Sequence, residues 1–166
     1  MASTRVVEPS VKRCCWRTGW RNIAVAVLAG ASLPLAFAPV NFFPLALIAP
    51  AILFWLWLDS LPKQAFITGY LFGLGFFGVG ISWVAVSLYR FGNMGLVLSG
   101  VTTLIFVLLL ALYPAILGWV GRRYLSRLGR GCYLLLFLPS AWVLLEWVRG
   151  WLFTGLPWLH LGNSQT

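Results

Sequence analysis

Apolar residues fill five long stretches of the chain, separated by short polar or basic links. The stretches cover residues 23–38, 43–58, 65–89, 96–120 and 132–148. A helix needs roughly 17–25 residues to cross the hydrocarbon core of a bilayer, and the third and fourth stretches reach that length. The first two reach it only with flanking residues at the interface. The pattern therefore predicts an all-α fold, a polytopic bundle of about five transmembrane helices.

The two ends of the chain differ from this middle part. Residues 1–22 form a polar, basic tail, residues 23–149 form the bundle, and residues 150–166 are aromatic and apolar but broken by Gly and Pro. We interpret 150–166 as an interfacial or re-entrant segment, with a simple membrane-hugging loop as the alternative. Cleavage of a signal peptide after Ala38 is disfavoured, because Pro39 and four more apolar stretches follow.

The composition supports a membrane protein. Apolar residues make up 61% of the chain and charged residues only 9%, whereas about a quarter of the residues of a soluble domain are charged. The 10 Trp residues suit a lipid–water interface. The net charge of +9 would suggest nucleic acid as a partner of a soluble protein, but here the basic residues lie between apolar stretches and no nucleic-acid-binding motif is present. We therefore expect no nucleic-acid partner.

The distribution of Lys and Arg predicts the orientation of the chain. Ten of the 12 basic residues lie in the N-terminal tail and in the 59–64 and 121–131 links, which five spans would place on one side. Only Arg90 and Arg149 fall on the other side. Because basic residues favour the cytoplasmic side, we expect a multi-pass protein with its N-terminus in the cytoplasm and residues 149–166 outside.

Glycine and proline mark particular helices. Gly69 and Gly73 form a GxxxG pair in the third stretch, which favours close packing against another helix, with a groove for a lipid chain as the alternative. Proline inside an apolar stretch removes a backbone donor and should kink its helix. Four prolines occupy such positions: Pro34, Pro50, Pro114 and Pro139.

The sequence shows no catalytic residues and no metal or cofactor site. The three Cys and single His have no zinc-ligand spacing, and Cys14 or Cys15 could at most carry palmitate near the membrane. The three acidic residues lie on different segments, and neither a Gly-x-Ser-x-Gly nor a phosphate-binding loop occurs. We therefore expect no metal and no cofactor.

Glu146 and Arg149 are the residues that stand out chemically. They lie near the end of the last apolar stretch and are three apart, so they share a helix face. A charge at membrane depth is costly and indicates a functional site, while a structural ion pair near the outer interface is an equal alternative. Arg149 could also hold a lipid phosphate, because its planar fork matches such oxygens.

Three stretches together resemble one family, the N-terminal membrane domain of bacterial apolipoprotein N-acyltransferase. The first runs from Leu-Ala-Phe-Ala-Pro at 35–39 to Pro-Leu-Ala at 44–46, and the second is the glycine-rich stretch 69–92. The third is 146–165, where Arg-Gly-Trp, Thr-Gly-x-Pro-Trp and Gly-x-Ser-Gln occur in order. The third is the most specific, and the resemblance covers nearly all of the chain after residue 22.

The resemblance implies an integral enzyme of the bacterial inner membrane. It moves an acyl chain from a membrane phospholipid to the N-terminal cysteine amino group of an apolipoprotein, during lipoprotein maturation. The family carries its Glu-Lys-Cys triad in a nitrilase-like domain that follows the membrane helices, and the chemistry is two-step covalent catalysis. This sequence stops at Thr166 and none of its cysteines matches the nucleophile. The expectation is an N-terminal fragment that is inactive alone.

Only membrane-domain positions carry over from the family. The resemblance implies contact with the lipid substrate, or support of the catalytic domain, for six residues, and it implies no catalytic residue in this chain. The six are Trp83, Glu146, Arg149, Trp151, Trp158 and Gln165. From composition alone, a small helical transporter or a non-catalytic membrane subunit remains the alternative, although the paired broken helices of transporters are not evident.

Overall fold

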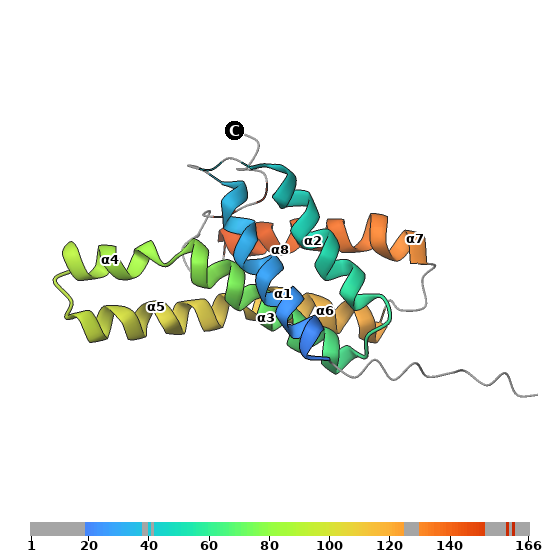
Figure 1. Cartoon of the computed structure of the whole chain (residues 1–166), viewed down its shortest axis with the longest axis horizontal. Helices are drawn as coiled ribbons and strands as arrows, with labels where there is room; N and C mark the ends of the chain where they lie inside the picture. The colour runs from blue at the N-terminus through green and yellow to red at the C-terminus, as the bar shows by residue number, and fades with distance from the viewer. Residues whose placement is uncertain are drawn as a thin grey trace, which may run out of the picture.

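The structure, a computed structural model, describes residues 19–37, 40, 42–124, 130–151, 159 and 161. These residues form helices and connecting turns without any β-strand, which confirms the predicted all-α fold for this part of the chain (Figure 1). The helices are α1 (Trp20–Ser32), η1 (Leu33–Ala36), α2 (Pro44–Trp57), α3 (Pro62–Gly80), α4 (Trp83–Arg90), α5 (Leu96–Leu110), α6 (Leu112–Tyr124), α7 (Arg130–Cys132), η2 (Tyr133–Phe137) and α8 (Leu138–Trp151).

The helices differ in their ability to cross a membrane. In the described residues, two helical stretches are long and apolar enough, namely 96–124, made of α5 and α6, and 130–151, made of α7, η2 and α8. A third span exists if α3 and α4 count as one bent helix. Helix 20–36 and α2 are apolar but shorter. The structure therefore supports two to three spans by length and composition.

The third apolar stretch is broken where one continuous helix was predicted. α3 ends at Gly80, and α4 starts at Trp83 after a bend of 46°. Ile81 between them has left the helical region, with φ −114° and ψ 13°. Gly78 and Gly80 precede the break, and glycine is a poor helix former because it loses the most backbone entropy. The prediction of a single helix over 65–89 was wrong for this reason.

α3 lies at the centre of the bundle and packs against α1 on one face and α6 on another. Toward α6, an added Cβ at Gly69 would lie 2.6 Å from the Pro114 carbonyl oxygen, and one at Gly73 would lie 2.7 Å from Ala111 Cα. The two backbones thus approach closely where the GxxxG pair faces α6. The prediction that this pair serves helix packing is confirmed.

α1 packs against the opposite face of α3 in the same way, with glycines where the two backbones approach closely. A Cβ added at Gly75 would lie 2.5 Å from the Val27 carbonyl oxygen, and one at Gly30 would clash with the Phe72 carbonyl. α1 accordingly crosses α3 at close range, as Figure 1 shows. Between these backbone contacts, the side chains of Phe72, Phe76 and Phe77 are fully or almost fully buried.

α4 and the first half of α5 form a hairpin that extends away from the rest of the bundle (Figure 1). Its surface is apolar and exposed, with Phe91 87% and Val97 79% accessible. Exposed apolar side chains of this density suit a lipid environment. The hairpin is therefore the part of the described fold with the least protein around it.

Candidate functional site

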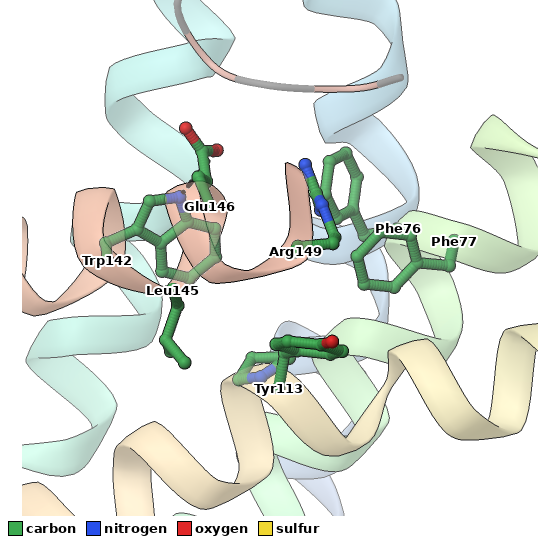
Figure 2. A pocket seen from close by; sticks show the side chains of 8 residues that line it. Phe76, Phe77, Tyr113, Trp142, Leu145, Glu146 and Arg149 are labelled. Atoms are coloured by element: carbon green, nitrogen blue, oxygen red, sulfur yellow. Dashed lines mark hydrogen bonds between the residues drawn. The ribbon is translucent and has the colours of Figure 1, made fainter. Parts of the chain in front are cut away.

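A pocket opens between α8, α6 and the end of α3. The hollow is open at its mouth, and about 20 Å³ of it can be reached by the centre of a water molecule. Eight side chains line it: Phe76, Phe77, Tyr113, Pro114, Trp142, Leu145, Glu146 and Arg149 (Figure 2). Six of them are aromatic or aliphatic, so the pocket is an apolar hollow with one carboxylate and one guanidinium at its edge.

The α8 wall of the pocket follows from helix periodicity. Trp142, Glu146 and Arg149 are spaced four and three residues apart, which places them on one face of the helix. Val143, Leu144 and Trp147 on other faces are exposed and apolar. The helix thus turns its polar groups inward and its apolar side chains outward, the reverse of a helix in a soluble protein.

Glu146 is half-buried and accepts two hydrogen bonds on a single oxygen. Its Oε1 lies 3.0 Å from the Trp142 indole nitrogen, one helix turn earlier. The same oxygen lies 3.0 Å from the backbone nitrogen of Leu161. The carboxylate therefore connects α8 to a segment 15 residues further along the chain.

Arg149 is buried, with only 5% of its surface exposed. Its Nη2 donates to the backbone carbonyl of Leu159 at 3.0 Å. Its Cζ also lies 5.3 Å from the centroid of the Phe77 ring, within the range of a cation–π contact. In Figure 2 the Arg149 and Glu146 side chains extend from α8 in the same general direction. Each of the two residues thus contacts the backbone at Leu159 or Leu161 and the ring of an aromatic neighbour.

The pocket contains one further polar group. The Tyr113 hydroxyl is buried, and no hydrogen-bond partner for it exists in the described part of the chain. No cluster of three or more His, Cys, Asp or Glu side chains that could hold a metal is found among those residues either. The chemistry available at the pocket is therefore apolar contact, hydrogen bonding and attraction of negative charge by Arg149.

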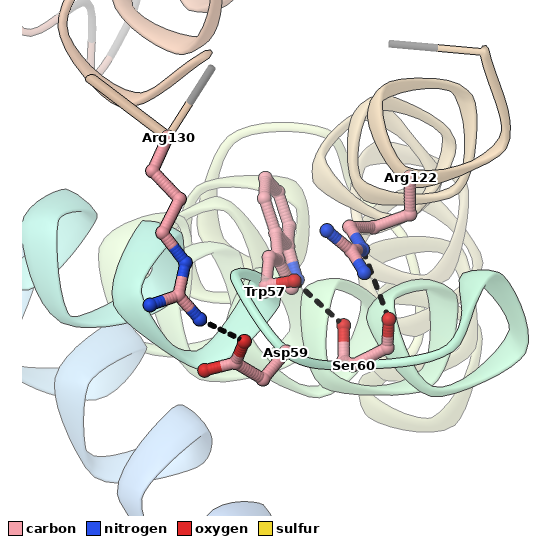
Figure 3. Close-up of polar contacts among 5 residues, drawn as sticks. All are labelled: Trp57, Asp59, Ser60, Arg122 and Arg130. Atoms are coloured by element: carbon pink, nitrogen blue, oxygen red, sulfur yellow. Dashed lines mark hydrogen bonds and ion pairs between the residues drawn. The ribbon is translucent and has the colours of Figure 1, made fainter. Parts of the chain in front are cut away.

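A second polar cluster ties the α2–α3 loop to two other helices (Figure 3). Arg122 Nε at the end of α6 donates to the Ser60 carbonyl at 2.9 Å. Arg130 at the start of α7 forms an ion pair with Asp59, and both side chains are exposed. Arg122 and Arg130 thus lie beside the α2–α3 loop in one polar cluster. This cluster is a polar end of the fold, away from the pocket residues.

The structure brings together two of the six predicted site residues, Glu146 and Arg149. Trp83 begins α4 and is 47% exposed, and Trp151 ends α8 and is 85% exposed. Neither lines the pocket. Trp158 and Gln165 lie outside the described residues.

The sequence analysis missed the apolar walls of the pocket. Trp142 could have been found, because it lies four residues before Glu146 and so shares its face. Phe76, Phe77 and Tyr113 come from helices that are distant in sequence, and no local pattern links them to α8. Their place at the pocket depends on how α3 and α6 pack.

Comparison with known proteins identifies the family. Residues 29–166 match the apolipoprotein N-acyltransferase N-terminal domain. The chain belongs to the apolipoprotein N-acyltransferase family. The apolipoprotein N-acyltransferase of Methylococcus capsulatus is 47% identical over 88% of this chain. Those of Coxiella burnetii and Vibrio cholerae are 48% and 44% identical over 87% and 84% of it.

The match covers a defined part of these acyltransferases. The aligned region is 29% of the Methylococcus capsulatus protein, 30% of the Coxiella burnetii protein and 28% of the Vibrio cholerae protein. The chain therefore spans less than a third of the length of these relatives. It corresponds to an N-terminal fragment of the apolipoprotein N-acyltransferases, as the resemblance predicted.

Proposed function

We propose that this chain is the membrane part of an apolipoprotein N-acyltransferase of the bacterial inner membrane. The enzyme would transfer an acyl chain from phospholipid to the N-terminal cysteine amino group of lipoproteins. The match of residues 29–166 to the family's N-terminal domain carries this proposal. The apolar pocket beside α8, with Arg149 at its edge, fits a site that meets lipid.

The topology belongs to the same proposal. Five spans result if helix 20–36, α2, the bent α3–α4 pair, α5–α6 and α7–α8 each cross the membrane. The basic links around Ser60 and Arg122 would then face the cytoplasm, together with the N-terminal tail. Residues 149–166 would face the periplasm.

The six predicted site residues keep their proposed role of contacting lipid or supporting the catalytic part of the enzyme. Trp83 and Trp151 are exposed aromatic side chains at helix ends, which suits an interfacial position. Glu146 and Arg149 hold polar groups at the pocket edge. For Trp158 and Gln165, this proposed role rests on the resemblance alone.

A chimaera tests the proposal. The part of this chain that aligns with the Methylococcus capsulatus enzyme would replace its counterpart in that enzyme. We expect this chimaera to acylate a lipoprotein substrate with label from radiolabelled phospholipid, in membranes depleted of the native enzyme. The control is the Methylococcus capsulatus enzyme with the aligned part deleted, which should be inactive. A chimaera that inserts at normal yield but transfers no acyl chain would contradict the proposal.

A further inference from the structure

We propose that Glu146 and Arg149 form a backbone clamp, which fixes the chain at Leu159 and Leu161 against the ends of α3 and α8. The clamp residues are positioning residues, which act through the segment that they hold. The clamp gives Glu146 and Arg149 the supporting role that the proposed function assigns to them. The inference thus deepens the proposed function.

The first support is the pairing of complementary backbone groups. Arg149 donates to the Leu159 carbonyl at 3.0 Å, and Glu146 accepts from the Leu161 amide at 3.0 Å. One helix face therefore satisfies a carbonyl and an amide that flank a single residue. Leu159 has φ 60°, a left-handed conformation that a leucine adopts only where its surroundings hold it.

The second support is the apolar anchor beneath the same segment. The side chain of Leu159 lies so close to Gly80 that an added Cβ there would clash with it. Leu159 and Leu161 both pack against the buried core. The segment is thus held by α8 through hydrogen bonds and by the end of α3 through side-chain contact.

The third support is that Arg149 is buried and already uses one of its donors on the chain's own backbone. Arg149 is 5% exposed, donates to Leu159 and lies over the Phe77 ring. A lipid phosphate would have to displace Leu159 to take the Nη2 donor. Hydrogen bonds from charged groups are about twice as strong as neutral ones, so Glu and Arg suit a clamp.

Cysteine accessibility tests the clamp without any measurement of activity. The three native cysteines would become Ser, and Leu161→Cys would report on the segment, since its backbone amide is retained. Thr103→Cys, 7% exposed on α5, is the matched reporter of the bundle. We expect Glu146→Ala and Arg149→Ala to speed maleimide labelling at position 161 about tenfold, because local opening becomes easier. Labelling at position 103 should not change.

Two results of the labelling experiment would overturn the clamp. One is an unchanged rate at position 161 in both alanine variants. The other is an equal acceleration at position 103, because that would mean a general loss of folding. Glu146→Gln, which keeps an acceptor oxygen, should accelerate labelling less than Glu146→Ala.

A compensating pair tests the anchor. Gly80→Val should displace the Leu159 side chain and speed labelling at position 161. Adding Leu159→Ala to Gly80→Val should reduce that acceleration, because the valine then fills the space that the leucine side chain held. Gly78→Val is the matched control, because no atom lies within 4 Å of a Cβ added there. If Leu159→Ala does not reduce the faster labelling that Gly80→Val causes at position 161, the proposed packing of the Leu159 side chain against α3 is refuted.

Turnover in the chimaera separates the clamp from a lipid-binding role. If Glu146 and Arg149 position the following segment, their alanine variants lower kcat and leave KM for phospholipid unchanged. A raised KM with unchanged kcat would overturn the positioning role. An unmodified chimaera without turnover would refute the proposed function instead, and the labelling results would still decide the clamp.

Discussion

The glycines of α3 do different work at different positions. Gly69 and Gly73 face the α6 backbone so closely that no side chain fits without a shift of that backbone. Gly78, in the same helix, has no atom within 4 Å of its missing Cβ. Close backbone approach matters in a membrane, where helix association depends on van der Waals packing because lipid removes the hydrophobic driving force.

Alanine at these positions should therefore have opposite effects. Gly73→Ala must move Ala111 or Pro114, so we expect a loss of about 1–3 kcal/mol in the free energy of unfolding. Gly78→Ala should be neutral or stabilise by up to about 1 kcal/mol, because alanine is the better helix former. Thermal unfolding in detergent measures both. Equal melting temperatures for the two variants would contradict the packing role of Gly73.

Two buried hydroxyl groups, those of Thr68 and Tyr113, should also contribute differently to stability. Thr68 Oγ1 accepts from the Trp57 indole nitrogen at 3.2 Å, and both residues are buried. Thr68→Val leaves that N–H without an acceptor, so we expect a loss of about 1–3 kcal/mol. Tyr113→Phe removes a buried hydroxyl that has no partner among the described residues, so stability should stay equal or rise. A lower melting temperature for Tyr113→Phe would show that its hydroxyl is bonded.

At the scale of the elements, three prolines coincide with changes in helix type. Pro34 lies in the 3₁₀ turn η1, and Pro139 is the second residue of α8, which begins directly after the π-helical turn η2. Pro114 lacks the donor that the Leu110 carbonyl would need, and α5 and α6 are interrupted at Ala111. Pro50, by contrast, remains inside α2 without a break. Neighbouring turns adjust to the missing donors, as expected in membrane helices.

The links between elements should contribute unequally to stability. Arg122→Ala removes a part-buried hydrogen bond to Ser60, so we expect a loss of about 1–2 kcal/mol. Asp59→Asn removes an ion pair whose side chains are 65% and 73% exposed, so the loss should stay below about 1 kcal/mol. Unfolding of both variants in detergent measures the difference. A larger effect of Asp59→Asn would contradict this ranking.

At the scale of the whole molecule, Arg122 and Arg130 lie beside Asp59 and Ser60, and five spans would place these residues on the same side of the membrane as the basic N-terminal tail. A reporter fused after Thr166 that works only in the periplasm should therefore be active, and one fused after Arg130 should be inactive. A cytoplasmic reporter should give the opposite result at both positions. Activity of the periplasmic reporter after Arg130 but not after Thr166 would exclude five spans with the N-terminus inside.

Chain-local features were predictable because their causes lie within a few residues. Helix follows from long apolar runs in which only intrahelical bonds can satisfy the backbone, and packing at Gly69 and Gly73 follows from a four-residue spacing. The shared face of Glu146 and Arg149 follows from helix periodicity. The break at Ile81 was not predicted, because an apolar run shows that a segment suits the membrane interior but does not show whether its helix is straight or bent.

The pocket and the clamp depend on contacts between distant segments. Phe77 and Tyr113 meet Arg149 only because α3 and α6 pack beside α8. Leu159, whose φ is 60° and whose carbonyl accepts from Arg149, lies beside Gly80 although the two residues are far apart in the sequence. Burial and hydrogen-bond partners arise from this packing, whereas sequence alone showed two costly charges near a membrane surface. The fold decides what those charges contact, because a charge in an apolar bundle is stable only where other segments supply its partners.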